Sequence, residues 1–193
     1  MRILVVSDTH GKLNRFMRVF EKLKKESPVD LIIHCGDYYE DAMSISRRCG
    51  IRVAAVKGNC DGYFDDCSYC IVETEAGNFL VCHGHMEGVS HDLQRLYYKV
   101  LESGCIGAFF GHTHRSAYVD IEGIYLMNPG SLTSPRDGSG GTFGLMETDP
   151  DTVFGKICRY DDFIGSGSSG GRGSKSGVTG GRLRSLLNYS DRF

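Results

Sequence analysis

Apolar residues in the first third of the chain alternate between short unbroken runs and helical spacings. Residues 2–7 form a run rich in β-branched side chains, which is typical of a strand buried on both faces, and residues 31–34 and 51–56 form two more runs. Between these runs, residues 12–26 carry apolar side chains at three- and four-residue spacings, and residues 40–49 also look helical. This β-α-β-α-β order predicts a parallel sheet with right-handed crossovers.

The pattern changes after residue 68. Residues 69–74 and 78–82 flank a short turn and predict a β-hairpin, and residues 90–103 predict another amphipathic helix. Short apolar runs with little helix between them complete the pattern: residues 106–110, 117–121, 124–127, 143–147 and 153–160. We therefore predict an α/β fold in which a mixed sheet packs on a second, more antiparallel sheet. Helices outside both sheets would make a four-layer α-β-β-α sandwich.

The composition of the chain changes abruptly at Gly165. Residues 165–181 consist almost wholly of Gly, Ser, Thr, Arg and Lys, a flexible-linker composition, and residues 182–189 could form one short helix. Five Lys or Arg residues and one Asp give residues 165–193 a charge of +4, which leaves −6 for residues 1–164 because the whole chain carries −2. We predict one globular domain over residues 1–164 and a basic, flexible tail over residues 165–193.

Overall composition narrows the class of protein only slightly. The chain contains 40% hydrophobic residues, and its net charge of −2 gives no general attraction to nucleic acid or anionic membranes. No apolar stretch is long enough to span a bilayer. The N-terminal residues run directly into a polar motif without a signal-peptide cleavage region, so we expect a cytoplasmic protein.

Eight cysteines are distributed along the chain. Cys82, Cys105 and Cys158 lie in apolar runs, where cysteine acts as a small buried hydrophobe. Cys67 and Cys70 have the C-x-x-C spacing of zinc and redox sites, but no second pair supports such a use. Packing is therefore the favoured role of these cysteines.

Side chains of the types that bind metals follow the apolar runs in five clusters. The candidate ligands are Asp8, His10, Asp37, Asn59, His83, His112 and His114. Because strand ends converge at one edge of an α/β sheet, we expect these clusters to lie together. Carboxylate and amide oxygens mixed with imidazole nitrogens favour divalent transition-metal ions.

The spacing of the candidate ligands indicates how two ions could be shared. Asp8 and His10 are one residue apart, so both could reach one ion, whereas the two oxygens of Asp37 could bridge two ions. Such a bridge holds the ions about 3.5–4 Å apart, and a water that they share becomes a nucleophile near neutral pH. Not every histidine fits this scheme: His34 lies inside an apolar run and is interpreted as a core residue. His85 could touch substrate or orient a ligand.

These clusters resemble the motifs of the calcineurin-like metallophosphoesterase superfamily over about residues 1–160. The matching motifs are Asp8-x-His10, Gly36-Asp37, Gly58-Asn59-x-Asp61, His83-Gly84 and Gly111-His112-x-His114. Cys60, the run Asn128-Pro129-Gly130-Ser131 and the small size resemble the short prokaryotic, YfcE-type phosphodiesterases. The resemblance implies a four-layer fold and two metal sites that share Asp37. The first would comprise Asp8, His10, Asp37 and His114, and the second Asp37, Asn59, His83 and His112.

The resemblance also implies a function. We expect a metal-dependent phosphodiesterase that acts on a small phosphodiester, with nucleic acid relevant only as a substrate, and a homo-oligomer is an open alternative to a monomer. Manganese is the leading metal, although nickel, iron, cobalt and zinc also suit these ligands. Asp61 and His85 are the candidate catalytic residues beyond the metal ligands. The rival is a scaffold similar to Vps29-type proteins, which lack hydrolysis; retention of all seven candidate ligands favours the enzyme.

One position departs from the family pattern. Many relatives carry a histidine where this chain has Cys60, and that histidine is thought to protonate the leaving group. A thiol with an ordinary pKa near 8.5 is a weaker donor, so we expect a preference for good leaving groups. Two readings stay open for the loop that contains Ser131, which could face the site or form a simple turn. Arg136 could contact a substrate phosphate or lie on the surface.

Overall fold

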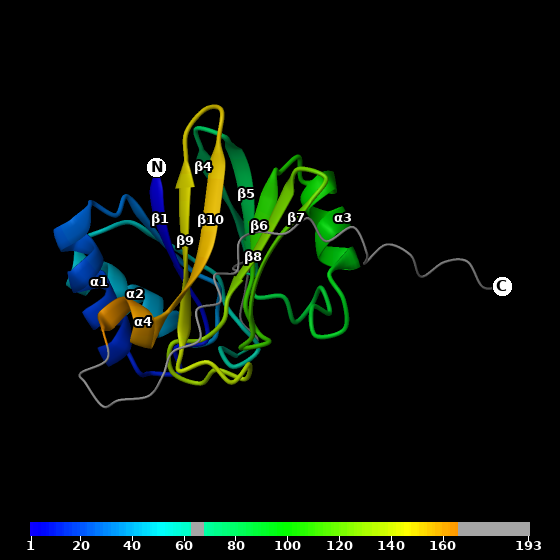
Figure 1. Ribbon diagram of the computed structural model, residues 1–193. Coiled ribbons are helices and arrows are strands. Elements are labelled where there is room, and N and C mark those ends of the chain that lie inside the picture. Colours follow the sequence, from blue (N-terminus) through cyan, green and yellow to red (C-terminus); the bar gives the residue numbers. More distant parts are fainter. Residues whose placement is uncertain (63–67, 166–193) are drawn as a thin grey trace.

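Two β-sheets pack face to face between helices. The computed structural model describes residues 1–62 and 68–165. Figure 1 shows α1 (Asn14–Glu26), α2 (Tyr39–Cys49) and α4 (Tyr160–Ile164) outside one sheet and α3 (Gln94–Glu102) outside the other. The predicted four-layer α-β-β-α sandwich is confirmed.

The first sheet contains the predicted parallel core. Its strand order is β10-β9-β1-β2-β3, with β1, β2 and β3 parallel and β9 and β10 added antiparallel. Its strands are β1 (Arg2–Val6), β2 (Leu31–His34), β3 (Val53–Ala55), β9 (Thr142–Thr148) and β10 (Val153–Arg159). On β1, Leu4 and Val6 pack toward the helices while Ile3 and Val5 pack toward the other sheet. This double burial explains the unbroken apolar run.

The second sheet has the order β4-β5-β6-β8-β7. Its strands are β4 (Tyr69–Thr74), β5 (Gly77–Cys82), β6 (Gly107–Phe109), β7 (Ser116–Ile121) and β8 (Ile124–Pro129). The prediction that this sheet would be more antiparallel is wrong, because β5, β6 and β8 pair in parallel. The chain crosses from β5 to β6 through α3, and β7 pairs on the outside of β8 instead of between β6 and β8. Each sheet therefore has two parallel and two antiparallel pairings.

Two other boundaries differ from the prediction. The helix expected over residues 90–103 begins at Gln94, and the strand expected to reach Tyr160 ends at Arg159. Tyr160 instead begins α4, with its ring buried, its N–H donating to the carbonyl of Gly141 and the guanidinium of Arg15 over its ring. This anchoring turns the chain away from the sheet, which a run of apolar residues cannot indicate.

Three apolar layers hold the sandwich together: one under α1 and α2, one between the sheets and one under α3. Within the described residues, no helix is both long and apolar enough to cross a membrane. The predicted tail lies outside the described residues except for Gly165, and so does Cys67 of the C-x-x-C pair.

Candidate metal centre

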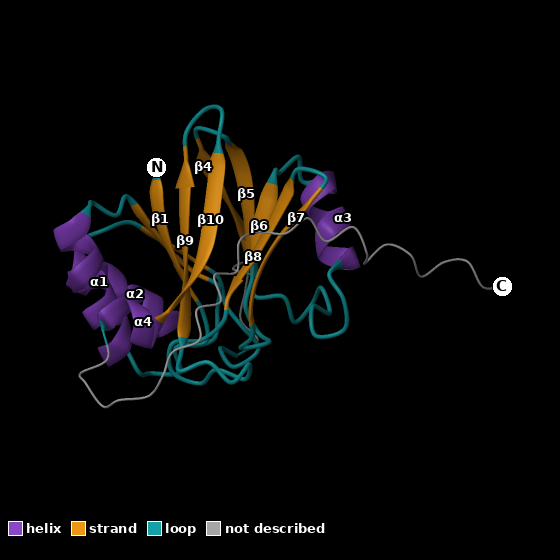
Figure 2. Ribbon diagram, in the orientation of Figure 1, coloured by secondary structure: helices purple, strands orange, loops and turns teal. Residues whose placement is uncertain are grey.

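The candidate ligands lie in loops at one edge of the sandwich. They follow five strands, β1, β2, β3, β5 and β6, which are parallel within each sheet. Figure 2 shows loops gathered beneath the strands at this edge, opposite the N-terminus. The fold therefore brings together residues as far apart in sequence as Asp8 and His114.

One group of side chains matches the first predicted site. Ligand atoms of Asp8, His10, Asp37 and His114 all lie within 4.8 Å of one another. Nε2 of His114 is 3.3 Å from Oδ1 of Asp8, and Nε2 of His10 is 3.9 Å from Oδ2 of Asp37. The two Nε2 atoms of His10 and His114 face each other at 3.4 Å. These atoms could surround a single ion.

A second group lies on the other side of Asp37. Nε2 of His83 is 3.3 Å from Oδ1 of Asp37 and 3.1 Å from Oδ1 of Asn59. Nδ1 of His112 is 3.0 Å from the same Asn59 oxygen. Asp37 thus presents Oδ2 to the first group and Oδ1 to the second, as a carboxylate bridging two ions would.

Outer hydrogen bonds orient two of the imidazoles. Nδ1 of His83 lies 2.7 Å from the carbonyl oxygen of Cys35, and Nδ1 of His114 lies 2.7 Å from the carbonyl oxygen of Ser134. Because a carbonyl oxygen can only accept, each Nδ1 carries the proton and each Nε2 carries a lone pair toward the site. The tautomers therefore suit metal binding.

Backbone strain concentrates on the candidate ligands. Asp8, His10, Asp37, His112 and His114 all have positive φ angles, between 48° and 69°. Although Asp and His tolerate this left-handed region better than most residues, positive φ remains uncommon outside glycine. Such strain persists where the surrounding structure fixes it, and it is frequent at functional sites.

Burial and charge at this edge fit a cation. Asp8 is fully buried, and its Oδ1 makes no hydrogen bond to any described residue. Burial raises the pKa of this carboxyl to about 6, although His114 and the N–H of His112 act to lower it, because a buried charge is costly. A divalent ion would supply the missing positive charge. Burial also lowers the pKa of His83 to about 4, which keeps a neutral nitrogen available for an ion.

Two glycines give these side chains room. A Cβ at Gly36, whose φ is 96°, would stand 2.7 Å from Nδ1 of His83. A Cβ at Gly58 would collide with the carboxylate of Asp37. Both positions require glycine because the loops pass directly beside candidate ligands.

Sequence comparison identifies the family of this site. The family model for the calcineurin-like phosphoesterase superfamily domain matches residues 1–151. The chain belongs to this superfamily. The predicted family is therefore confirmed, and it makes the chain a hydrolase of the metallophosphoesterase class.

Individual relatives support this placement. The chain is 35% identical over 136 residues to the probable metallophosphoesterase YsnB of Bacillus subtilis, covering 70% of this chain and 78% of the relative. It is 26% identical over 171 residues to the phosphodiesterase YfcE of Escherichia coli, covering 77% and 89%. Similarity to short prokaryotic phosphoesterases, YfcE among them, was expected from the motifs.

Solved structures share the fold. A protein of Streptococcus pneumoniae described as a predicted phosphoesterase superposes with a TM-score of 0.67 at 24% identity, over 83% of this chain and 90% of that one. Zinc-complexed Vps29 of Entamoeba histolytica gives a TM-score of 0.65 at 18% identity, over 83% and 99%. At these identities the likeness concerns architecture alone.

The two predicted catalytic residues of this phosphoesterase-family chain lie in different surroundings. Both carboxylate oxygens of Asp61 accept backbone N–H groups, Oδ1 from Tyr39 at 2.7 Å and Oδ2 from Gly58 at 2.8 Å. Asp61 thus ties the Asn59 loop to the start of α2, which favours a positioning role. His85 is exposed, with its ring 5.4 Å from that of His83 and 6.2 Å from that of His112. Their catalytic roles stay predictions.

Cys60 lies at the surface beside the second group. Its N–H donates to Oδ1 of Asp37 at 3.0 Å, and Nδ2 of Asn59 lies 3.6 Å from its sulfur. Partial burial and the neighbouring Asp37 carboxylate raise the pKa of the thiol to about 11. Its sulfur therefore keeps its proton at neutral pH.

The loop after β8 donates hydrogen bonds to the backbone of two candidate ligands. The hydroxyl of Ser131 is buried and donates to the carbonyl of Asp8 at 2.9 Å, so Ser131 supports the strained turn of the first group instead of facing substrate. The N–H of Arg136 donates to the carbonyl of His114 at 2.9 Å. Burial is the main cause that lowers the pKa values of His10 and His112, and the positive charge of Arg136 adds to this effect. The exposed guanidinium of Arg136 therefore acts on both groups of candidate ligands.

A buried chain of hydrogen bonds from His34 through Thr9 to Asp41, called the relay below, was not predicted from the sequence. Nε2 of His34 lies 2.9 Å from Oγ1 of Thr9, and that hydroxyl donates to Oδ2 of Asp41 at 2.6 Å. The N–H of Gly11 donates to the same Asp41 oxygen at 2.8 Å. The interpretation of His34 as a core residue agrees with its complete burial. Asp41 carried no usable signal, since an acidic residue in the first helical turn is common.

Proposed function

We propose that this protein is a phosphodiesterase whose active site holds two divalent ions, with manganese as the leading candidate. The observation that carries the proposal is the placement of Asp37, whose two oxygens face two separate groups of candidate ligands. Two ions bound there would supply a hydroxide nucleophile near neutral pH and positive charge for the phosphoryl oxygens.

The roles of the chain's own residues follow from their contacts. Asp8, His10, Asp37 and His114 would hold one ion; Asp37, Asn59, His83 and His112 would hold the other. Cys35 and Ser134 carbonyls keep the imidazole lone pairs of His83 and His114 directed inward. The guanidinium of Arg136, which forms no ion pair with any described residue, would attract the anionic substrate.

In this proposal, no residue is an effective general acid for protonating the leaving group. Cys60 occupies the position of the family histidine, and its thiol holds its proton too firmly to give it up in the transition state. We therefore propose that aryl esters and other good leaving groups react fastest. His85 is the nearest alternative donor among the predicted residues, and its exposed ring leaves it accessible to substrate.

The proposal also includes the domain boundary, the tail, the location and the oligomeric state. The tail, residues 165–193, would lie outside the chemistry, and the globular domain would end at Ile164. A cytoplasmic location and self-association stay predictions. The rival function is a scaffold without hydrolysis, which draws on the fold likeness to Vps29.

A screen of phosphoesters after metal reconstitution tests the proposal. The purified chain, loaded with manganese, is assayed on paired phosphomonoesters and phosphodiesters, with Asp37→Asn as the control. We expect diesters to be hydrolysed faster than monoesters and the control to lose almost all activity. Hydrolysis confined to monoesters would overturn the diester assignment. Absence of hydrolysis with manganese, and with nickel, iron, cobalt and zinc loaded in turn, would favour the scaffold.

A further inference from the structure

Tyr38 stands beside the first group of candidate ligands. Its ring centroid lies 5.2 Å from that of His10 in an edge-to-face arrangement, and the His10 ring stacks on His114 at 5.1 Å. Although it is a large aromatic residue, 44% of Tyr38 is exposed. A Cβ at Gly11 would stand 3.9 Å from Cε1 of Tyr38, so the absence of a side chain there leaves this part of the ring uncovered.

The backbone of Tyr38 is strained, although Tyr38 is not a candidate metal ligand. Its φ of 68° and ψ of 66° lie in the left-handed region, which bulky side chains rarely adopt. Among the described residues other than glycine, positive φ otherwise occurs at five candidate ligands and at Glu122, in the turn between β7 and β8. Tyr38 is therefore the strained residue at this edge that holds no ion in the proposed centre.

Hydrogen bonds fix the backbone of Tyr38 without using its side chain. The N–H of Tyr39 donates to Asp61 at 2.7 Å, and the N–H of Asp41 donates to the Tyr38 carbonyl at 2.9 Å. The Tyr38 hydroxyl makes no hydrogen bond to the described part of the chain. Glycine or asparagine would satisfy the same backbone bonds with less strain. The ring is thus not required by the fold.

We propose that Tyr38 forms a subsite that binds an aromatic ring in the organic part of the substrate, either a nucleobase or an aryl group. This inference rests on the proposed phosphodiesterase function and narrows its substrate class. Because His10, a candidate ligand of the first group, contacts the Tyr38 ring, a phosphoryl group bound there would have Tyr38 as a neighbour. Aromatic side chains stack on any base, since every base has a π-face.

The absence of tryptophan from the chain provides a direct test. Tyr38→Trp introduces a single fluorescent reporter into the full-length, manganese-loaded protein. Adenosine 5′-monophosphate, phenyl phosphate and ribose 5-phosphate are titrated separately. The two aromatic ligands should quench the fluorescence in a saturable way, and ribose 5-phosphate should change it little. A matched control is Tyr98→Trp on α3, where the residue is 53% exposed, and its fluorescence should not respond.

Equal quenching by ribose 5-phosphate would overturn the aromatic subsite. So would calorimetric binding of adenosine 5′-monophosphate without any fluorescence change in Tyr38→Trp. If only one aromatic ligand quenches, the subsite is assigned to that class, nucleobase or aryl, and the proposal stands in that narrower form.

A second variant separates this role from a structural one. Tyr38→Asn suits the left-handed backbone, so its urea midpoint should be equal to or higher than that of the parent. Its affinity for adenosine 5′-monophosphate should fall about tenfold or more relative to ribose 5-phosphate, as loss of a stacking contact predicts. Manganese affinity, measured by calorimetry, should stay within about twofold.

The outcomes distinguish the subsite from the function on which it rests. Parent protein that hydrolyses diesters, with ligand preference unchanged in Tyr38→Asn, would refute the subsite alone. A large loss of manganese affinity in Tyr38→Asn would instead assign the ring to holding His10 and would overturn the proposal. Failure of the parent to hydrolyse any phosphoester would refute the function itself.

Discussion

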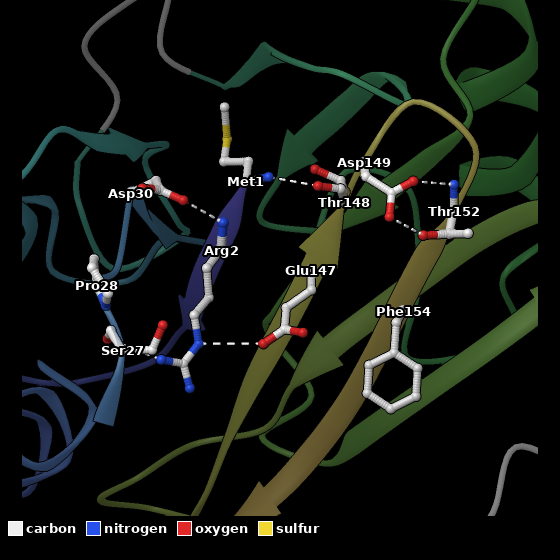
Figure 3. A pocket seen from close by; sticks show the side chains of 10 residues that line it. All are labelled: Met1, Arg2, Ser27, Pro28, Asp30, Glu147, Thr148, Asp149, Thr152 and Phe154. Atoms are coloured by element: carbon white, nitrogen blue, oxygen red, sulfur yellow. Dashed lines mark hydrogen bonds and ion pairs between the residues drawn. The ribbon is translucent and has the colours of Figure 1, made fainter. Parts of the chain in front are cut away.

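The two ends of the sheet sandwich differ in the backbone strain of the residues that gather there. At the end near the N-terminus, a hollow of about 500 Å³ is lined by residues that include Arg2, Glu147 and Asp149 (Figure 3). Arg2 Nε is buried and makes no hydrogen bond to the described residues, although it lies 3.4 Å from Glu147 Oε1, and Asp149 accepts from the Thr152 hydroxyl at 2.6 Å. No residue lining this hollow has a positive φ.

The opposite end carries the candidate metal centre, and there the backbone is strained. Six residues with positive φ converge there, five candidate ligands and Tyr38, and the fully buried Asp8 keeps one oxygen without a hydrogen bond to the described residues. The comparison teaches that a hollow with charged residues is not sufficient to mark a functional site. Because each end has a buried charged side chain with an atom that lacks a hydrogen bond, backbone strain at charged residues is the more specific sign.

Matched carboxylate changes at the two ends should have the most unequal effects. We expect Asp8→Asn to lower phosphoester hydrolysis roughly 10²–10⁴-fold, because one ion loses a charged ligand. Glu147→Gln should change the rate less than about twofold, because this exposed carboxylate lies at the end opposite the candidate metal centre. Steady-state kinetics of both variants with manganese would check this contrast, and equal losses would erase it.

A substitution at Cys60 tests which residue of the metal centre protonates the leaving group. Replacing Cys60 by His should speed hydrolysis of alkyl phosphodiesters by about tenfold or more, because a general acid near neutral pH is restored. Aryl diesters should gain much less, since their leaving groups need little protonation. Rates on matched aryl and alkyl diesters measure this difference. The absence of a gain on alkyl esters would count against the proposed weakness of Cys60.

His34 gives the stability of this end a pH dependence. Burial lowers its pKa to about 4 despite the opposing charge of Asp41, whereas an exposed histidine titrates near 6.5. Below pH 6.5 the unfolded chain therefore binds a proton that the folded chain refuses, and stability falls by up to about 1.4 kcal/mol per pH unit until about pH 4.

His34→Gln should remove this contribution while keeping a donor for Thr9. Urea unfolding followed by circular dichroism from pH 7 to pH 4.5 should show a shallower loss of stability in the variant. Glu147→Gln, at the other end, provides a control for surface charge. Parallel curves for the parent and His34→Gln would show that burial does not hold His34 neutral.

The tail should have the smallest effect. Removing residues 166–193 should leave kcat/KM for a phosphodiester within about twofold, since the candidate ligands all precede residue 115. A large loss would place part of the tail in the chemistry. Kinetics of the shortened and full-length chains at matched manganese concentration would decide.

Sequence pattern and structure agree where local burial decides the outcome. The run at residues 2–7 indicated a strand buried on both faces, and Ile3 and Leu4 pack on opposite sides of β1. Ligand spacing after each strand also indicated convergence, which the distances around Asp37 support. Periodicity registers which positions are buried, and strand ends in a parallel sheet share an edge.

Features that depend on pairing or on backbone angles were not accessible from the sequence. β6 and β8 are neighbours because β7 pairs on the outer edge of β8. The apolar pattern of a strand does not indicate which strand lies beside it. The start of α4 at Tyr160 depends on contacts with Gly141 and Arg15, distant in sequence. Positive φ at Tyr38 and the relay through Asp41 leave no signature in residue type.

The central claim is that Asp37 joins two ion sites at the strained end of the sandwich. Manganese bound per chain, measured by calorimetry and elemental analysis on the parent and on Asp37→Asn, tests it most directly. We predict two ions per parent chain, at most one in Asp37→Asn, and loss of hydrolysis in parallel. Two ions and full activity in Asp37→Asn, or no more than one ion in the parent, would contradict the account.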